Sequence, residues 1–118
     1  MSIRTEKAAS TIKRIMAKPI GDLAGEYYPG SLVTITSIRL SPDMRLAKVY
    51  LSFYGKSISP GAFIDILTEK KGYIRSVIGA GIRLRFTPDL KFFIDDTLDQ
   101  IEHIQSLLDS VKKSGNPE

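Results

Sequence analysis

The stretch FIDILTEKKGYIRSVIGAGIRLRF, residues 63–86, contains two helical patterns, one on either side of Gly72. Apolar side chains recur there at the three- and four-residue spacing of amphipathic helices. They are Phe63, Ile64, Ile66 and Leu67 before the glycine and Tyr73, Ile74, Val77, Ile78 and Ile82 after it. Residues 70–86 also contain five basic residues and no acid. We therefore predict two short helices that meet at a kink at Gly72, with a phosphate-binding corner at Lys70, Lys71 and Arg75.

The length and composition of the chain are those of one ordinary domain. Its 118 residues can bury a core without a metal or a disulfide. The absence of cysteine excludes a disulfide framework, a thiolate metal site and a cysteine nucleophile, and it agrees with a cytoplasmic location. Neither a secretory signal nor a membrane-spanning run is visible. We expect a single domain over residues 1–110, a polar, frayed tail over 111–118, and no contact with a membrane.

The charges are unevenly distributed along the chain. Residues 1–91 contain 15 Lys or Arg and 7 Asp or Glu, a net charge of +8, whereas residues 92–118 contain 2 and 6, a net charge of −4. This distribution indicates a face that binds a polyanion and a last segment that points elsewhere. Uneven but functionless surface charge is the alternative.

The other segments predict the order α-β-β-α-α-β-α. Residues 3–18 form an amphipathic pattern that Pro19 should end or kink, and Ser59 and Pro60 should begin the next helix. Residues 32–40 and 45–53 predict a β-hairpin, with a bulge near Thr36 or Ser37 where the alternation slips. Residues 90–95 predict a third strand, and Asp96 the start of a last helix. We expect a two-layer α+β domain with a three-stranded mixed sheet, whose third strand lies beside the first and parallel to it.

This order resembles a type II KH domain, an RNA-binding fold. The sequence resembles the bacterial ribosome-binding factor A family in RTEKAASTIKRIM (residues 4–16), LSPDMRLAKVYLSFYG (40–55) and GYIRSVIGAGIRLRFTPDLKFFIDDTLDQIEHIQSLL (72–108). In that family an A-x-G kink replaces the usual G-x-x-G loop between the two helices. Here the position reads Lys70-Lys71-Gly72, so a lysine stands where the family has alanine. The last helix predicted from Asp96 onward is an extra C-terminal helix added to the αββααβ order.

The resemblance implies a non-enzymatic assembly factor. Such a factor binds the immature small (30S) ribosomal subunit and its 16S rRNA and supports late maturation and 5′-end processing. The family is also associated with growth in the cold and with release by a biogenesis GTPase. The alternative is a protein-interaction module that docks on ribosomal proteins through the apolar and acidic last helix. We expect the chain to act as a monomer.

Basic residues bind RNA through its phosphates, so they are the candidate site. The candidates are Arg4, Lys7, Arg14 and Lys18 on the first helix, Arg45 and Lys48 on the hairpin, Lys70, Lys71, Gly72 and Arg75 at the kink, and Arg83 and Arg85 after it. Solvated helix faces and protective edge-strand charges are the competing explanations. Tyr50 is the one tyrosine placed to stack on a base. Gly79 and Gly81 indicate close helix packing, and Gly79, between Arg75 and Arg83, would also let an RNA strand approach.

Enzymatic functions have little support. His103 is the only histidine, and no cysteine is available to pair with it. The carboxylates of Asp95, Asp96 and Asp99 are better explained as the charged start of the last helix than as a Mg²⁺ site. We expect no catalytic residue, no metal and no cofactor.

Overall fold

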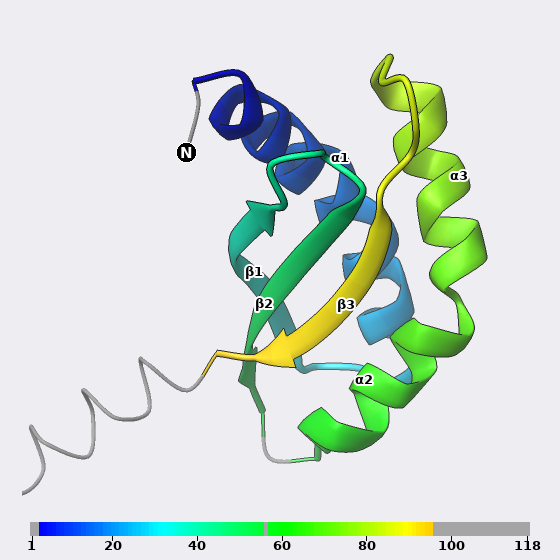
Figure 1. Cartoon of the computed structure of the whole chain (residues 1–118). Coiled ribbons are helices and arrows are strands. Elements are labelled where there is room, and N and C mark those ends of the chain that lie inside the picture. Colours follow the sequence, from blue (N-terminus) through cyan, green and yellow to red (C-terminus); the bar gives the residue numbers. More distant parts are fainter. Residues whose placement is uncertain (1–2, 56, 96–118) are drawn as a thin grey trace, which may run out of the picture.

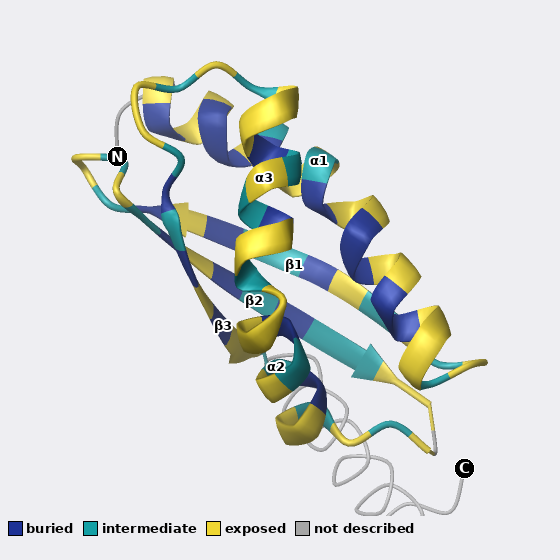
Figure 2. Ribbon diagram, turned by 90° about the vertical axis from the view of Figure 1, so that its right-hand side faces the viewer, coloured by how far each residue is buried: buried dark blue, intermediate teal, exposed yellow. Residues whose placement is uncertain are grey.

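The structure, a computed structural model, describes residues 3–55 and 57–95. Its elements are α1 (Ile3–Tyr27), β1 (Leu32–Leu40), β2 (Leu46–Tyr54), α2 (Pro60–Glu69), α3 (Lys71–Gly81) and β3 (Asp89–Ile94). The strands form one mixed sheet, and the three helices lie on the same face of it (Figure 1, Figure 2). The predicted two-layer α+β arrangement is therefore confirmed. The expected last helix, the tail at 111–118 and the domain end at residue 110 lie outside the described residues.

β2 is the central strand of the sheet, which corrects the predicted strand order. β1 pairs with β2 antiparallel, and β3 pairs with β2 in parallel, with Ala47 opposite Leu90 and Val49 opposite Phe92. The prediction that the third strand lies beside the first was wrong. On the same face, α1 packs over β1 and α2 contacts β3, so the connection through α2 and α3 places β3 at the edge of β2 that β1 leaves free. The alternation of residues 45–53 predicts Ala47, Val49, Leu51 and Phe53 in the core. The first three are fully buried, and Phe53 is partly buried.

The predicted bulge in β1 lies at Thr36. The register with β2 shifts between Ile35 and Ser37, so Ile35 and Ile38 both point into the core. The Thr36 hydroxyl lies 3.2 Å from the Tyr50 carbonyl oxygen and also hydrogen-bonds the Asp95 carboxylate. The bulge thus ties β1 to β2 and to the end of β3.

The first helix continues through Pro19 to Tyr27, so of the two predicted effects of Pro19, an end or a kink, the end is wrong. A proline inside a helix costs about 3 kcal/mol, because it lacks an N–H and crowds the preceding turn. Burial of a large aliphatic side chain contributes about 1.5–3 kcal/mol. Ile20 and Leu23, both buried beyond the proline, together offset that cost. Tertiary packing therefore keeps residues 19–27 helical.

The break between α2 and α3 lies at Lys70 and not at Gly72. The Lys70 N–H donates to the Ile66 carbonyl at 2.9 Å, and its own carbonyl accepts the Ile74 N–H at 3.0 Å, so the residue caps both helices. Its φ of −90° and ψ of 10° are open to any side chain. Gly72 is the second residue of α3, and an added Cβ there would meet nothing within 4 Å. A lysine in place of the family's alanine therefore fits the break without strain.

The VIGAG run lies inside α3, and its last glycine sits close to α1. A Cβ on Gly81 would lie 2.8 Å from Ile15 Cδ1, and one on Gly79 would lie 3.1 Å from Thr87 Oγ1. The expected close helix packing is confirmed for Gly81, whereas Gly79 approaches the connection between α3 and β3. Likewise α2 begins at Pro60 with Ser59 at the N-cap position, although the Ser59 side chain makes no capping hydrogen bond.

Candidate nucleic-acid interface

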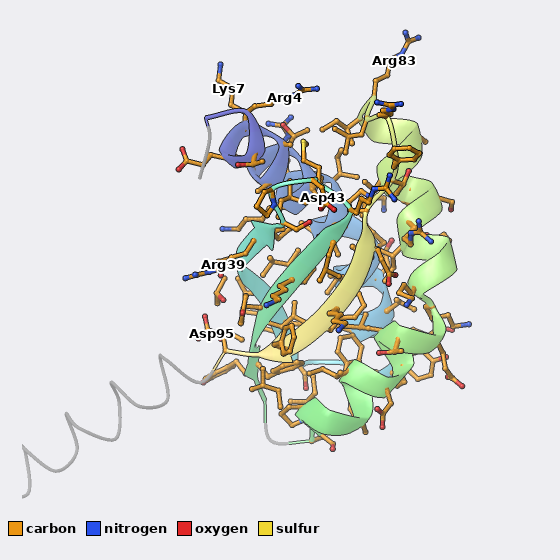
Figure 3. The ribbon with its side chains drawn as sticks, viewed as in Figure 1. Arg4, Lys7, Arg39, Asp43, Arg83 and Asp95 are labelled. Atoms are coloured by element: carbon orange, nitrogen blue, oxygen red, sulfur yellow. The ribbon has the colours of Figure 1, made fainter. Side chains whose placement is uncertain are left out.

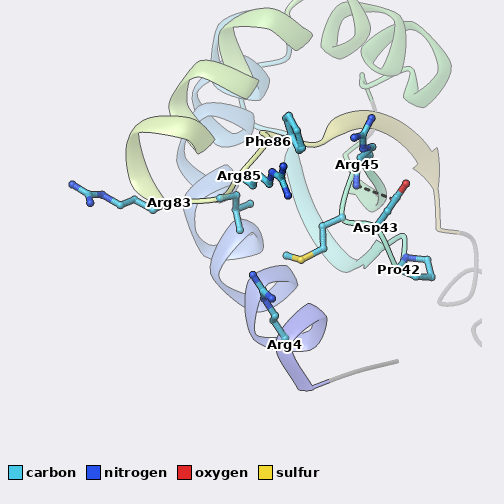
Figure 4. Close-up of a pocket in the computed structure, with 9 residues that line it drawn as sticks. Arg4, Pro42, Asp43, Arg45, Arg83, Arg85 and Phe86 are labelled. Carbon is cyan, nitrogen blue, oxygen red and sulfur yellow. Dashed lines mark hydrogen bonds between the residues drawn. The ribbon is translucent and has the colours of Figure 1, made fainter.

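Four arginines from three separate segments gather at one end of the molecule. Arg4 comes from the start of α1, Arg45 from the β1–β2 turn, and Arg83 and Arg85 from the connection between α3 and β3 (Figure 4). The hollow that they line has a volume of about 370 Å³ and is completed by Pro42, Asp43, Met44, Leu84 and Phe86. We call it the arginine hollow. All four arginines were candidates in the sequence, and the fold brings them together.

The β1–β2 turn that carries Arg45 is held by a small hydrogen-bond network. The Met44 N–H donates to the Ser41 carbonyl at 2.8 Å. One Asp43 oxygen accepts from the Ser41 hydroxyl at 2.6 Å and from the Arg45 N–H at 3.1 Å. These bonds hold the pKa of the Asp43 carboxyl below its ordinary value, with the Ser41 bond the largest cause. Met44 takes a left-handed φ of 61° within this turn. The network therefore fixes where the Arg45 side chain begins.

Phe86 presents an exposed aromatic ring among the guanidinium groups. The central carbon of Arg45 lies 4.8 Å from the ring centroid, and that of Arg85 lies 5.5 Å from it. The ring is 49% exposed. Cations beside an exposed ring suit a ligand that has both phosphates and flat bases. The sequence-based prediction missed Phe86, although the alternation Arg83-Leu84-Arg85-Phe86 placed it beside two arginines.

The charge of the arginine hollow is almost uncompensated. Among the described residues, Asp43 is the only acid that lines it, against four arginines. Within residues 3–55 and 57–95, none of these arginines forms an ion pair. All four residues are exposed. Since like charges held together raise the local potential, this end of the molecule attracts anions.

Two members of the predicted phosphate corner have partners inside the protein. Lys71 Nζ lies 3.0 Å from an Asp89 carboxylate oxygen. Arg75 donates to the Thr87 carbonyl at 2.9 Å and to the Pro88 carbonyl at 3.1 Å. Both side chains therefore tie α3 to the start of β3, and neither lines the arginine hollow.

Lys70 is exposed but lies in an acidic setting. It lines a second hollow, of about 290 Å³, together with Asp22 and Glu26 of α1 and with Tyr73. These carboxylates oppose the approach of a phosphate. The structure therefore separates the predicted corner, including Gly72, from the arginine hollow.

The basic stripe on α1 is exposed along its length, as predicted, but only its first residue lines the arginine hollow. Lys7 lies near Arg4 at the same end of the molecule as Arg83 (Figure 3). Lys18 is 14 residues from Arg4, about 21 Å along the helix, and it pairs with Asp22 at 3.3 Å. Arg14 lies between them. Arg4 and Lys7 are thus the part of the stripe nearest the hollow.

The ion pair between Lys71 and Asp89 makes the stability of the fold depend on pH. The hydrogen bond from Lys71 is the largest cause that holds the pKa of the Asp89 carboxyl below its ordinary value of 3.8. Because the pKa of Asp89 is lower in the folded state, the ion pair stabilises the fold at pH values above the pKa of the unfolded state. This stabilisation is lost as the pH falls through the pKa of the folded state. Because both side chains are partly exposed, we expect Asp89→Asn to lower the free energy of unfolding by only about 0.2–1 kcal/mol at neutral pH.

Urea unfolding of wild type and Asp89→Asn at several pH values checks this expectation. The difference between the two proteins should be constant from neutral pH down to about 5, shrink progressively below that, and vanish in strong acid. A difference of equal size throughout the acid range would contradict the role of the ion pair.

The described residues contain no group of three or more His, Cys, Asp or Glu side chains able to hold a metal. His103, Asp96 and Asp99, which the sequence analysis weighed as possible catalytic or metal-binding residues, lie outside the described residues. None of the helices in the described ranges has the length and apolar character needed to cross a membrane.

Comparisons with known proteins agree on one family. A family model described as ribosome-binding factor A matches residues 4–108. The ribosome-binding factor A of Magnetococcus marinus is 32% identical over 114 residues, which cover 95% of this chain and 91% of that protein.

Solved structures of the same kind share the fold. The crystal structure of ribosome-binding factor A from Thermus thermophilus has a TM-score of 0.65 at 21% identity and covers 76% of this chain and 94% of that one. A model of the Thermus thermophilus factor, as fitted into a cryo-electron microscopy map of its 30S complex, has a TM-score of 0.61 at 25% identity and covers 74% and 90%. The predicted KH-like fold is confirmed by these likenesses.

Proposed function

The chain belongs to the ribosome-binding factor A family, and we propose that it binds the small (30S) ribosomal subunit through the phosphates and unpaired bases of 16S rRNA. The observation that carries this proposal is the arginine hollow, which Arg4, Arg45, Arg83 and Arg85 line and in which Arg45 and Arg85 lie beside the exposed ring of Phe86. A related protein has been fitted into the map of a 30S complex, which supports the same partner for this chain.

The proposed role is that of a non-enzymatic assembly factor in the cytoplasm. It acts as a monomer on the immature subunit, during late maturation and 5′-end processing of the rRNA and with particular importance in the cold. A biogenesis GTPase is the proposed agent of its release. The chemistry of the hollow supports a binding role, since guanidinium groups and an aromatic ring recognise phosphates and bases but supply no nucleophile.

The residues proposed to contact rRNA directly are the four arginines of the hollow, Phe86, and Lys7 at the same end of α1. Arg14 would extend this contact along α1. Lys71 and Arg75 are proposed to act by holding α3 on β3, because their polar groups are already bonded within the protein.

Co-sedimentation with purified subunits over a salt series tests the proposal. Four phosphate contacts predict a log–log salt slope of roughly −3, or a loss of about 50- to 150-fold between 50 and 200 mM salt. Immature small subunits should bind more tightly than mature ones, and large subunits serve as the control. Binding that does not depend on salt would instead favour docking on ribosomal proteins.

A further inference from the structure

The sheet has a second basic surface, on the face opposite the three helices (Figure 1, Figure 2). Arg39 of β1 pairs with Lys48 of β2, and Lys48 pairs with Lys91 of β3, so that three exposed cations form one row across all three strands. The next outward row contains Ser37, Tyr50 and Phe93. We call these six residues the open face. No described element covers it.

The row of cations is electrostatically unfavourable in the isolated protein. Neighbouring strands lie about 4.8 Å apart, and like charges directly opposite each other destabilise a sheet. The structure gives none of the three cations an ion-pair partner within the described ranges. The acids at the two ends of β3 are engaged elsewhere, Asp89 with Lys71 and Asp95 with Thr36. A bound polyanion would relieve the repulsion.

The aromatic row lies next to these charges. The rings of Tyr50 and Phe93 are stacked, with centroids 5.3 Å apart and planes 23° from parallel, and Phe93 is 37% exposed. Along each strand the two rows are two residues apart, about 6.6 Å. Proteins that bind single-stranded nucleic acid combine stacking rings with cations that follow the phosphates. The sequence had singled out Tyr50 and Lys48, and the fold adds Phe93, Lys91 and Arg39 beside them.

The β1–β2 turn lies between the open face and the arginine hollow. Arg39, Lys48 and Tyr50 line a shallow hollow of about 200 Å³ together with Ser41 and Leu46, at the two ends of the β1–β2 turn. Residues 42–45 of the same turn line the arginine hollow. A single strand of nucleic acid could therefore pass around this turn from the open face to the arginine hollow.

We propose that the open face binds an unpaired stretch of RNA, with a base stacked on Phe93 and phosphates held by Arg39, Lys48 and Lys91. This inference rests on the proposed function for its assignment of the ligand as rRNA. A duplex offers phosphates but no free base faces, so the open face should distinguish single from double strands.

Phe93→Trp in the full chain places a fluorescent probe on the open face. Its emission can be followed alone, because the protein has no other tryptophan. Titration with an eight-nucleotide oligouridylate should quench the tryptophan emission by roughly twofold at saturation, since a base stacks on the indole. A blunt RNA duplex of equal charge should leave the emission unchanged.

Lys91→Gln and Lys13→Gln in the Phe93→Trp protein form a matched pair. Both replace an exposed lysine, but Lys91 lies on the open face and Lys13 on α1. Lys91→Gln should weaken oligouridylate binding several-fold and reduce the salt slope by about 0.7. Lys13→Gln should change neither. Equal effects of the two substitutions would overturn the proposed row of contacts.

Two further outcomes would overturn the proposal while leaving the proposed function intact. One is unchanged emission with oligouridylate while the same protein still sediments with small subunits. The other is an emission that is blue-shifted and shielded from iodide before RNA is added, and unaffected by it. That second result would mean that residues 96–118 or a protein partner, and not RNA, occupy the open face.

Discussion

Replacing Arg45, Arg83 and Arg85 together with glutamine should reduce affinity for the small ribosomal subunit by between roughly 10² and 10³. Each guanidinium group is exposed and lines the arginine hollow. Three lost phosphate contacts should also flatten the log–log salt slope by about two to three units, at roughly 0.7–0.9 per contact. Co-sedimentation across a salt series measures both quantities. Because none of the three side chains is buried, thermal unfolding should be nearly unchanged.

A second triple variant provides the matched control. Lys13→Gln, Lys18→Gln and Lys70→Gln also remove three positive charges, but from exposed positions outside the arginine hollow. We expect at most a few-fold loss of affinity, through the reduced overall charge alone. If the two triple variants weaken binding equally, total charge and not the hollow governs binding, and the proposed site is wrong.

Phe63→Ala should lower the free energy of unfolding by about 3–5 kcal/mol, the largest effect we expect of a single substitution. The side chain is fully buried at the start of the α2–α3 stretch. Its ring packs edge-on against Tyr28, with centroids 6.0 Å apart, and against Phe53 at 6.2 Å. The loss is a large fraction of the ~5–15 kcal/mol typical of a domain. Urea unfolding followed by circular dichroism measures it.

Tyr73→Ala is the control for this prediction. Tyr73 belongs to the same helical stretch and shares the apolar spacing of the sequence, but it is 54% exposed. We expect a change within about 0.5 kcal/mol. Comparable losses for the two substitutions would mean that the burial pattern of this stretch is not the one described.

The local pattern of the chain was sufficient to predict most elements. Residues 32–40 and 45–53 were correctly predicted as a hairpin, and the slip in their alternation located the bulge at Thr36. The positions of Phe63, Leu67, Ile74 and Ile78 in the core also followed from their spacing. These features depend on neighbours within a few residues, which a single sequence displays directly.

Two helix boundaries were predicted incorrectly from the sequence. Pro19 was expected to end or kink the first helix, but the burial of Ile20 and Leu23 keeps α1 continuous through it. Gly72 was taken as the break, but Lys70 caps both helices in an unstrained conformation. At Pro19 a local cost of about 3 kcal/mol was weaker than the burial of Ile20 and Leu23. At the α2–α3 break the two backbone hydrogen bonds of Lys70 place the boundary two residues before the glycine.

The sequence by itself determined the order of the described helices and strands, most core positions, the α+β class and the family. The spacing of apolar residues and the short motifs that reveal these features involve only residues close together in the chain. Only the tertiary structure decided which cations act together. Lys71 and Arg75 became internal ties because β3 lies beside β2 and brings residues 87–89 under α3. Arg4, Arg45 and Arg83, far apart in the chain, meet because the same crossover returns the end of α3 to the β1–β2 turn.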